Sequence, residues 1–111
     1  MAVYDDFAKL DIRAGTILKA EEFPKARKSA YKLTIDFGEE IGIKRSSAQI
    51  TNYYAPDNLE GKKILAVVNF PPRQIADFMS EVLVLGTLSA GGVVLAVPDK
   101  PDCVKDGDKL C

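Results

Sequence analysis

The chain has 111 residues and a mass of 12.1 kDa, which predicts a single domain able to bury a core without disulfides or metals. Its 47% hydrophobic and 28% charged residues are typical of a soluble folded protein. The absence of histidine argues against catalytic centres and metal sites built on imidazole. The chain has 15 basic and 16 acidic residues, so contact with nucleic acid would need a local basic patch.

The first half of the chain predicts a short helix followed by three strands. Tyr4–Leu10 begins with two aspartates, which suit a helix N-terminus. Residues 12–23 predict a long strand, and Gly15 within it indicates a bulge or a barrel bend. In residues 33–37 apolar and polar side chains alternate, as in a half-buried strand. Residues 41–50 predict a third strand.

The second half predicts one helical turn and three further strands. Residues 56–61 read as a turn of helix that ends at a glycine. Residues 63–70 and 81–88 are the most apolar runs, and we expect them to be central strands. Residues 93–97 follow two glycines, which is a hairpin signal.

This arrangement favours an all-β fold, a small closed or partly open barrel. The strands are short, helix is scarce and glycines mark the bends. A chain of about 100 residues fits the five-stranded OB-fold barrel with short helical turns. A β-sandwich and an SH3-like barrel are the alternatives on pattern alone.

A basic run between two predicted strands is the clearest charge feature. Lys25, Arg27, Lys28 and Lys32 follow one another with no acidic residue between them. Such a loop can neutralise phosphates, while Tyr31 could stack on a base. The alternative is a solvated loop that keeps the neighbouring apolar strands soluble.

A second candidate site follows the strand expected at 63–70. Pro71-Pro72 should end that strand and hold the next loop open rather than paired in a hairpin. The loop would then expose apolar and guanidinium groups that can bind a polypeptide, or it would bury them as a cap on the barrel. The rim residues are Phe70, Arg73, Phe78 and Met79, and polar residues expected to face the same groove are Ser47, Gln49 and Asn69.

No arrangement of residues predicts an enzyme, a metal site or a cofactor site. Ser46-Ser47 lie beside Lys44, but neighbours on a strand point to opposite faces, which does not build a serine–lysine pair. Cys103 and Cys111 are expected to be free thiols, with a disulfide or a crosslink between copies as the alternative. Since no signal sequence or membrane-spanning run is evident, we expect a cytoplasmic protein.

Several ordered motifs resemble the tRNA-binding domain family. They are LDIRAGTI at 10–17, EEFPKARKSAYKLTIDFG at 21–38, IGIKRSSAQIT at 41–51, AVVNFPPR at 66–73 and SEVLVLG at 80–86. The later motifs resemble the export-related chaperone branch of that family. The resemblance runs from about Phe7 to the end of the chain.

The resemblance implies an OB-fold homodimer formed through the N- and C-terminal segments. The chaperone branch would bind unfolded or export-bound precursor polypeptides without ATP and cooperate with a SecA-like translocation motor. The tRNA-binding branch would instead recognise the shape of tRNA. The residues that would then contact tRNA are Lys25, Arg27, Lys28, Lys32, Arg73 and Ser80.

Two departures from the tRNA-binding branch favour polypeptide over tRNA. That branch commonly has a lysine where this chain has Pro71 and a glutamine where it has Glu81, while Arg73 and Ser80 match. Losing a cation and gaining an acid both weaken the attraction for phosphate. The same changes make the surface more apolar.

Overall fold

A computed structural model describes residues 1–111. The helical segments are α1 (Tyr4–Ala8), α2 (Gly38–Ile41), α3 (Pro56–Leu59) and the 3-10 turn η1 (Pro101–Cys103). The strands are β1 (Ile12–Glu22), β2 (Tyr31–Asp36), β3 (Ile43–Ala48), β4 (Lys63–Val67), β5 (Arg73–Ile75), β6 (Phe78–Ser80), β7 (Leu83–Val84), β8 (Gly86–Ser89) and β9 (Gly92–Leu95). None of the helices is long and apolar enough to cross a membrane.

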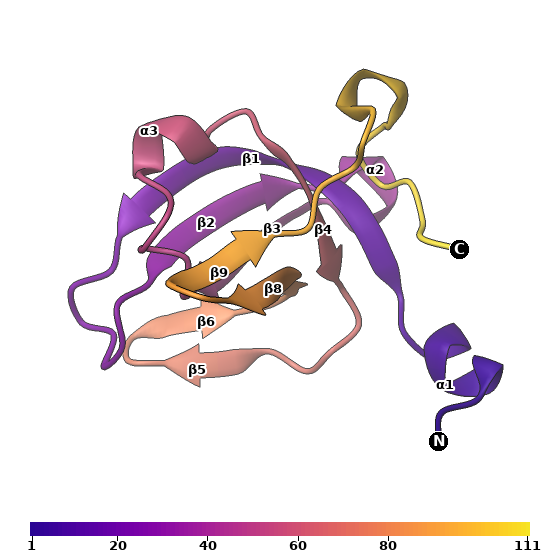
Figure 1. The fold of residues 1–111 in the computed structure, drawn as a ribbon, viewed down its shortest axis with the longest axis horizontal. Coiled ribbons are helices and arrows are strands. Elements are labelled where there is room, and N and C mark those ends of the chain that lie inside the picture. The colour runs from indigo at the N-terminus through magenta and orange to yellow at the C-terminus, as the bar shows by residue number, and fades with distance from the viewer.

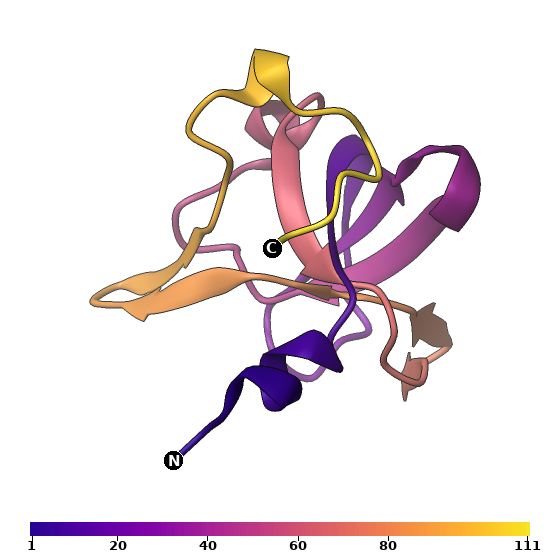
Figure 2. The same cartoon turned by 90° about the vertical axis from the view of Figure 1, so that its right-hand side faces the viewer.

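Five strands form one antiparallel sheet in the order β3-β2-β1-β4-β7, which curls into a nearly closed barrel (Figure 1). The long strand β1 makes this curvature, because residues 12–16 pair with β4 and residues 16–22 with β2. The hairpins β5–β6 and β8–β9 complete the molecule (Figure 2). The expectation of an all-β barrel of the OB type is confirmed.

The barrel closes where the outer edge of β3 meets the segment after β6. The amide of Glu81 donates to the Arg45 carbonyl at 2.8 Å, and the amide of Arg45 donates to the Glu81 carboxylate at 2.9 Å. The Ser47 amide donates to the Ser80 hydroxyl at 3.0 Å. At this seam the side chains of Ser80 and Glu81 accept hydrogen bonds that a neighbouring strand would otherwise accept. The groove described below lies next to this seam.

The C-terminal segment covers the part of β1 that β2 leaves unpaired. The amide of Ala14 donates to the Asp108 carbonyl at 2.8 Å, and the amide of Leu110 donates to the Ile12 carbonyl at 2.8 Å. Asp106 accepts from the Thr16 hydroxyl at 2.6 Å and from Lys63 Nζ at 2.9 Å. The end of the chain is therefore an integral part of the barrel.

The core is apolar and lies inside the barrel, where Phe37, Leu33, Ile35, Leu59 and Ile64 are all fully buried. These side chains come from β2, the turn after it, α3 and β4, so the alternation predicted for residues 33–37 does point inward. Burial of such side chains supplies most of the driving force for folding.

Two predicted strands differ from the structure. The third predicted strand, at residues 41–50, is present but shorter, because Gly42 adopts a φ of +85° and leaves Ile41 in α2, so that β3 begins at Ile43. Residues 81–88 do not form one central strand. The chain changes partner at Leu85, whose amide donates to Leu65 and whose carbonyl accepts from Ala96, so β8 leaves the barrel and is exposed throughout.

Two local predictions also need correction. The register shift in β1 falls between Ile17 and Lys19 rather than at Gly15. The segment after Pro72 is not an open loop, because Arg73 to Ser80 pair as the hairpin β5–β6. The prolines precede the ladder and so remove none of its donors.

Candidate binding groove

An apolar cavity of about 410 Å³ opens between the end of β3, the hairpin β5–β6 and β7. Phe70, Ile75 and Leu83 give it apolar walls, and Ser47 and Gln49 add polar groups. Phe70 and Leu83 remain 43% and 50% exposed, so part of this apolar surface faces solvent. The cavity can accept an apolar side chain of a ligand.

A basic cavity of about 800 Å³ adjoins the apolar one. It lies between the loop that connects β1 to β2 and the strand β5, and three cations of the basic run, Lys25, Arg27 and Lys28, line it together with Arg73. Both cavities share Arg73 as a wall residue. We call the two joined cavities the binding groove.

The cations of the binding groove differ in how they are paired. Lys25 Nζ lies 2.8 Å from the carboxylate of Asp77, and this hydrogen bond raises the pKa of Lys25 and lowers that of Asp77. None of the ion pairs in the structure involves Arg27, Lys28 or Arg73. Three positive charges therefore stay available to an anionic group.

Phe78 does not lie at the rim of this groove, and the prediction that it is partly exposed is wrong. It is 3% exposed and packs edge to face on Phe23, with ring centroids 5.4 Å apart. The guanidinium of Arg45 lies 4.4 Å from its ring centroid, and Lys32 Nζ lies 5.6 Å away. Phe78 anchors the hairpin β5–β6 to the barrel, and Lys32 covers this small cluster rather than lining the groove.

Three other predicted residues have different surroundings. Asn69 faces the start of the chain, since its amide group accepts from the Asp11 amide at 2.9 Å and donates to the Lys9 carbonyl at 2.8 Å. Met79 is exposed but lines neither cavity. Ser80 lines the apolar cavity, with its hydroxyl engaged by the Ser47 amide.

Sequence reasoning missed part of the groove. Its walls include residues of two very short strands, Gln74 and Ile75 of β5 and Leu83 and Val84 of β7. No periodic signal extends over strands of two or three residues. Only the pairing of β5 with β6, and of β7 with β4, brings these residues together.

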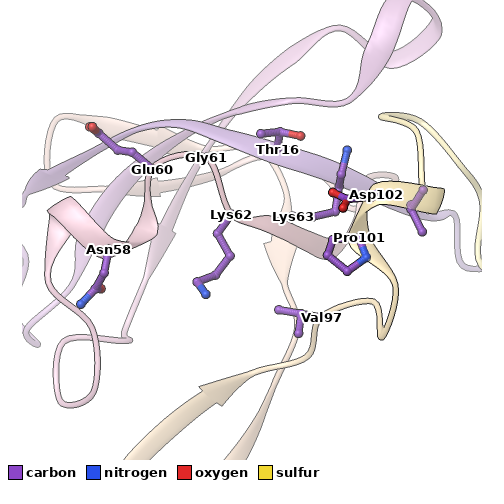
Figure 3. A pocket seen from close by; sticks show the side chains of 10 residues that line it. Thr16, Asn58, Glu60, Gly61, Lys62, Lys63, Val97, Pro101 and Asp102 are labelled. Atoms are coloured by element: carbon purple, nitrogen blue, oxygen red, sulfur yellow. The ribbon is translucent and has the colours of Figure 1, made fainter.

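A third cavity, of about 690 Å³, lies on another part of the barrel near the C-terminal segment (Figure 3). Lys62 and Lys63 line it together with Glu60 and Asp102, so its charges are balanced. Lys63 is already bound to Asp106 at 2.9 Å. None of the predicted site residues lies in this cavity, and it offers no surplus charge or extended apolar wall.

The two cysteines of the C-terminal segment, Cys103 and Cys111, are exposed and not joined by a disulfide. Neither lies in the binding groove.

Comparison with known proteins places this geometry in context. Residues 12–109 match the model of a family described as a putative tRNA-binding domain. The crystal structure of the CsaA chaperone protein of Picrophilus torridus is 56% identical, with a TM-score of 0.94 over 100% of both chains. That of chaperone CsaA from Bacillus anthracis is 53% identical, with a TM-score of 0.92 over 100% of this chain and 99% of the other.

A methionine–tRNA ligase of Archaeoglobus fulgidus is 36% identical over 107 residues, which is 96% of this chain. The match covers 16% of that ligase. Across the first curated relatives the matched part is 13% to 16% of their length. This chain therefore spans less than a fifth of the length of these curated relatives.

Proposed function

This chain belongs to the family of putative tRNA-binding domains, and from that premise we propose that it binds extended polypeptides in the binding groove as an ATP-independent chaperone. The observation that carries the proposal is the union of a partly exposed apolar wall with a cationic one. The likeness to two CsaA chaperones along the whole chain supports it. Binding without a reaction is sufficient for such a role.

The apolar wall suits a client that exposes side chains normally buried. Phe70 and Leu83 are large, partly exposed and joined by Ile75 in one cavity. Grouped exposed apolar surface is typical of an interaction site, whereas isolated exposed residues are not. Unfolded chains present such side chains repeatedly, so modest affinity at one groove suffices to hold them.

Suppression of the aggregation of an unfolded client, measured without ATP, tests this function. The double variant Phe70→Ser, Leu83→Ser should lose most of the protection because both anchors disappear, at a cost of about 1–3 kcal/mol in binding. Leu18→Ser is a matched control, since Leu18 is 48% exposed and lines neither cavity. If the folded double variant protects the client as well as the control does, the groove is not the polypeptide site.

Binding of tRNA is the second candidate function, and the family description together with the basic cavity favours it. Contacts of Arg27, Lys28 and Arg73 with phosphates would make the affinity fall steeply with salt. Changing Lys25, Arg27 and Lys28 together to glutamate should abolish such binding while the protein stays folded. Tight binding of tRNA by that triple variant would contradict a site in the basic cavity.

We further propose that the protein acts in the cytoplasm as a homodimer and passes precursor polypeptides to a SecA-like translocation motor. The similarity to two CsaA chaperones along the whole chain supports this proposal. Surface plasmon resonance with a purified motor protein should show binding that a saturating client polypeptide strengthens or weakens. No binding at micromolar concentration would contradict this partner.

A further inference from the structure

The strand β5 presents one unpaired edge to the binding groove. Four consecutive residues, Arg73, Gln74, Ile75 and Ala76, line the basic cavity. Successive side chains of a strand point to opposite faces, so a cavity against a face would be lined by alternate residues. A cavity lined by consecutive residues lies along the strand edge. β5 pairs only with β6, so this edge has no strand beside it.

The backbone N–H and C=O of Gln74 point toward that open edge. Only Ala76 and Asp77 separate the paired residues Ile75 and Phe78. In a hairpin with a two-residue loop, the pair that flanks the loop exchanges hydrogen bonds and the next pair does not. The next pair contains Gln74, so its N–H and C=O are directed away from β6. No turn or loop hydrogen bond of the backbone uses them.

The opposite wall of the groove is the end of β3 and the residues that follow it. Ser47 and Ala48 end β3, Gln49 and Ile50 come next, and all four line the apolar cavity. The last contact along the outer edge of β3 is the bond from the Ser47 amide to the Ser80 hydroxyl. The groove is thus a slot between the open edge of β5 and the end of β3, which is a shape suited to an extended chain.

Charge indicates which extended chain fits. Arg27, Lys28 and Arg73 line the slot without carboxylate partners. Lys25 is already paired with the carboxylate of Asp77. A strand lying along β5 would direct alternate side chains toward these cations, which attract acidic residues and repel basic ones. The adjoining apolar cavity accepts an apolar side chain of the same segment.

We propose that a client polypeptide adds to β5 as a third strand, pairing its backbone with Gln74 and placing an acidic side chain against Arg27 and Lys28. The inference rests on the proposed polypeptide-binding function and specifies how the client is recognised. Main-chain hydrogen bonds supply affinity that tolerates many sequences, and the cations select segments that combine acidic and apolar residues. Strands inside the sheets of folded proteins are already paired on both sides and could not add to β5.

Synthetic peptides that alternate acidic and apolar residues test the mode of binding by fluorescence anisotropy. One peptide is N-methylated at its odd positions and another at its even positions. Only alternate amides of an added strand face β5, so one methylated peptide should bind about tenfold more weakly and the other nearly as well as the parent. Replacing the acidic residues by their amides should also weaken binding. Equal binding of all these peptides would overturn the proposal.

Two variants of the same residue test the edge itself. Gln74→Pro removes the outward N–H, a change that an edge strand tolerates, whereas Gln74→Ala keeps it. The proline variant should bind the parent peptide about tenfold more weakly than the alanine variant, with circular dichroism confirming that both fold. Equal binding by the two folded variants would overturn the proposal. If the proline variant does not fold, the methylated peptides test the proposal instead.

The controls separate this inference from the proposed function. If the wild-type protein binds no unmethylated peptide, the polypeptide-binding function itself fails. If it binds every peptide equally, only pairing with β5 fails. A drop in tRNA binding, but not in peptide binding, on going from Gln74→Ala to Gln74→Pro would assign this edge to nucleic acid and overturn the proposal.

Discussion

At Gly15 the barrel has no room for a side chain. A Cβ atom there would lie 2.7 Å from Cδ1 of Phe37 and 2.8 Å from Cγ2 of Ile35, and both of those side chains are fully buried. The glycine allows β1 to pack closely on the core beside Thr16, where the strand bends from β4 to β2. Of the two predicted roles, a bulge or a barrel bend, the position fits the bend.

Gly15→Ala should therefore destabilise the protein by about 1–3 kcal/mol, because the core must move to admit the methyl group. Urea denaturation measures this free energy of unfolding. Lys19→Ala on the same strand is the control, since Lys19 is exposed and its contact with Glu21 is a surface pair worth little. A Gly15→Ala variant as stable as the control would contradict this account of the packing.

Tyr31 makes stability depend on pH at the alkaline end. Burial, followed by the charge of Glu22, raises the pKa of the Tyr31 phenol, and its hydroxyl donates to the Tyr54 carbonyl at 2.7 Å. Because the folded pKa exceeds the unfolded one, this stability is fully present below about pH 10 and is lost as the pH rises through the folded pKa.

Tyr31→Phe should lower the free energy of unfolding by about 1 kcal/mol at neutral pH, since the Tyr54 carbonyl loses its donor. Above pH 10 the variant should lose less stability than the wild type does, because it has no phenol to ionise. Thermal unfolding measured from pH 7 to pH 11 compares the two. Parallel curves would show that folding does not raise the pKa of Tyr31.

Among the elements, those with a strong local pattern of apolar and polar residues could be predicted. Those whose limits depend on hydrogen bonds to distant segments could not. Residues 33–37 alternate apolar and polar side chains, and the structure has β2 there with its apolar face in the core. Residues 81–88 are equally apolar but divide between β7 and β8. Their division depends on the hydrogen bonds of Leu85 to Leu65 and Ala96, which lie in other parts of the chain.

The C-terminal segment is an element that carries little periodic signal, yet it supports the barrel. Asp106 joins the Thr16 hydroxyl and the Lys63 ammonium, whose side chain is only 16% exposed. Asp106→Ala should cost about 1–3 kcal/mol of stability, because it leaves a largely buried ammonium without its carboxylate. Urea denaturation should show this loss, whereas Asp102→Ala should change little since Asp102 is exposed and has no ion-pair partner. Equal effects would contradict the role given to Asp106.

For the whole molecule, the basic wall of the site could be predicted because most of its cations lie in one short run of sequence. The apolar wall could not, because its residues come from separate parts of the chain. The run from Lys25 to Lys28 lines the groove as one loop, and Arg73 lies beside it. Phe78 misled the prediction, since composition cannot distinguish a buried hairpin anchor from an exposed rim residue. Its burial depends on packing against Phe23, which is more than fifty residues earlier in the chain.

The most exposed large apolar side chains lie on elements that extend from the barrel. Val3 and Tyr4, at the start of α1, are 64% and 77% exposed, and Leu88 of the hairpin β8–β9 is 96% exposed. Figure 2 shows both α1 and this hairpin extending beyond the barrel. Such surface suits burial against a second copy of the chain, which agrees with the homodimer that we propose.

Light scattering at micromolar concentration should accordingly give a mass of about twice the 12.1 kDa of one chain. The double variant Tyr4→Asp, Leu88→Asp should shift the protein to monomer, because each two-fold interface would then bury like charges at self-complementary contacts. Dithiothreitol should leave the wild-type mass unchanged, since Cys103 and Cys111 would not hold the two copies together. A monomer at all these concentrations, or a dimer lost on reduction, would contradict the proposal. If the dimer forms, two grooves can hold one extended client at two points, and the monomeric variant should then release it faster by the loss of effective concentration.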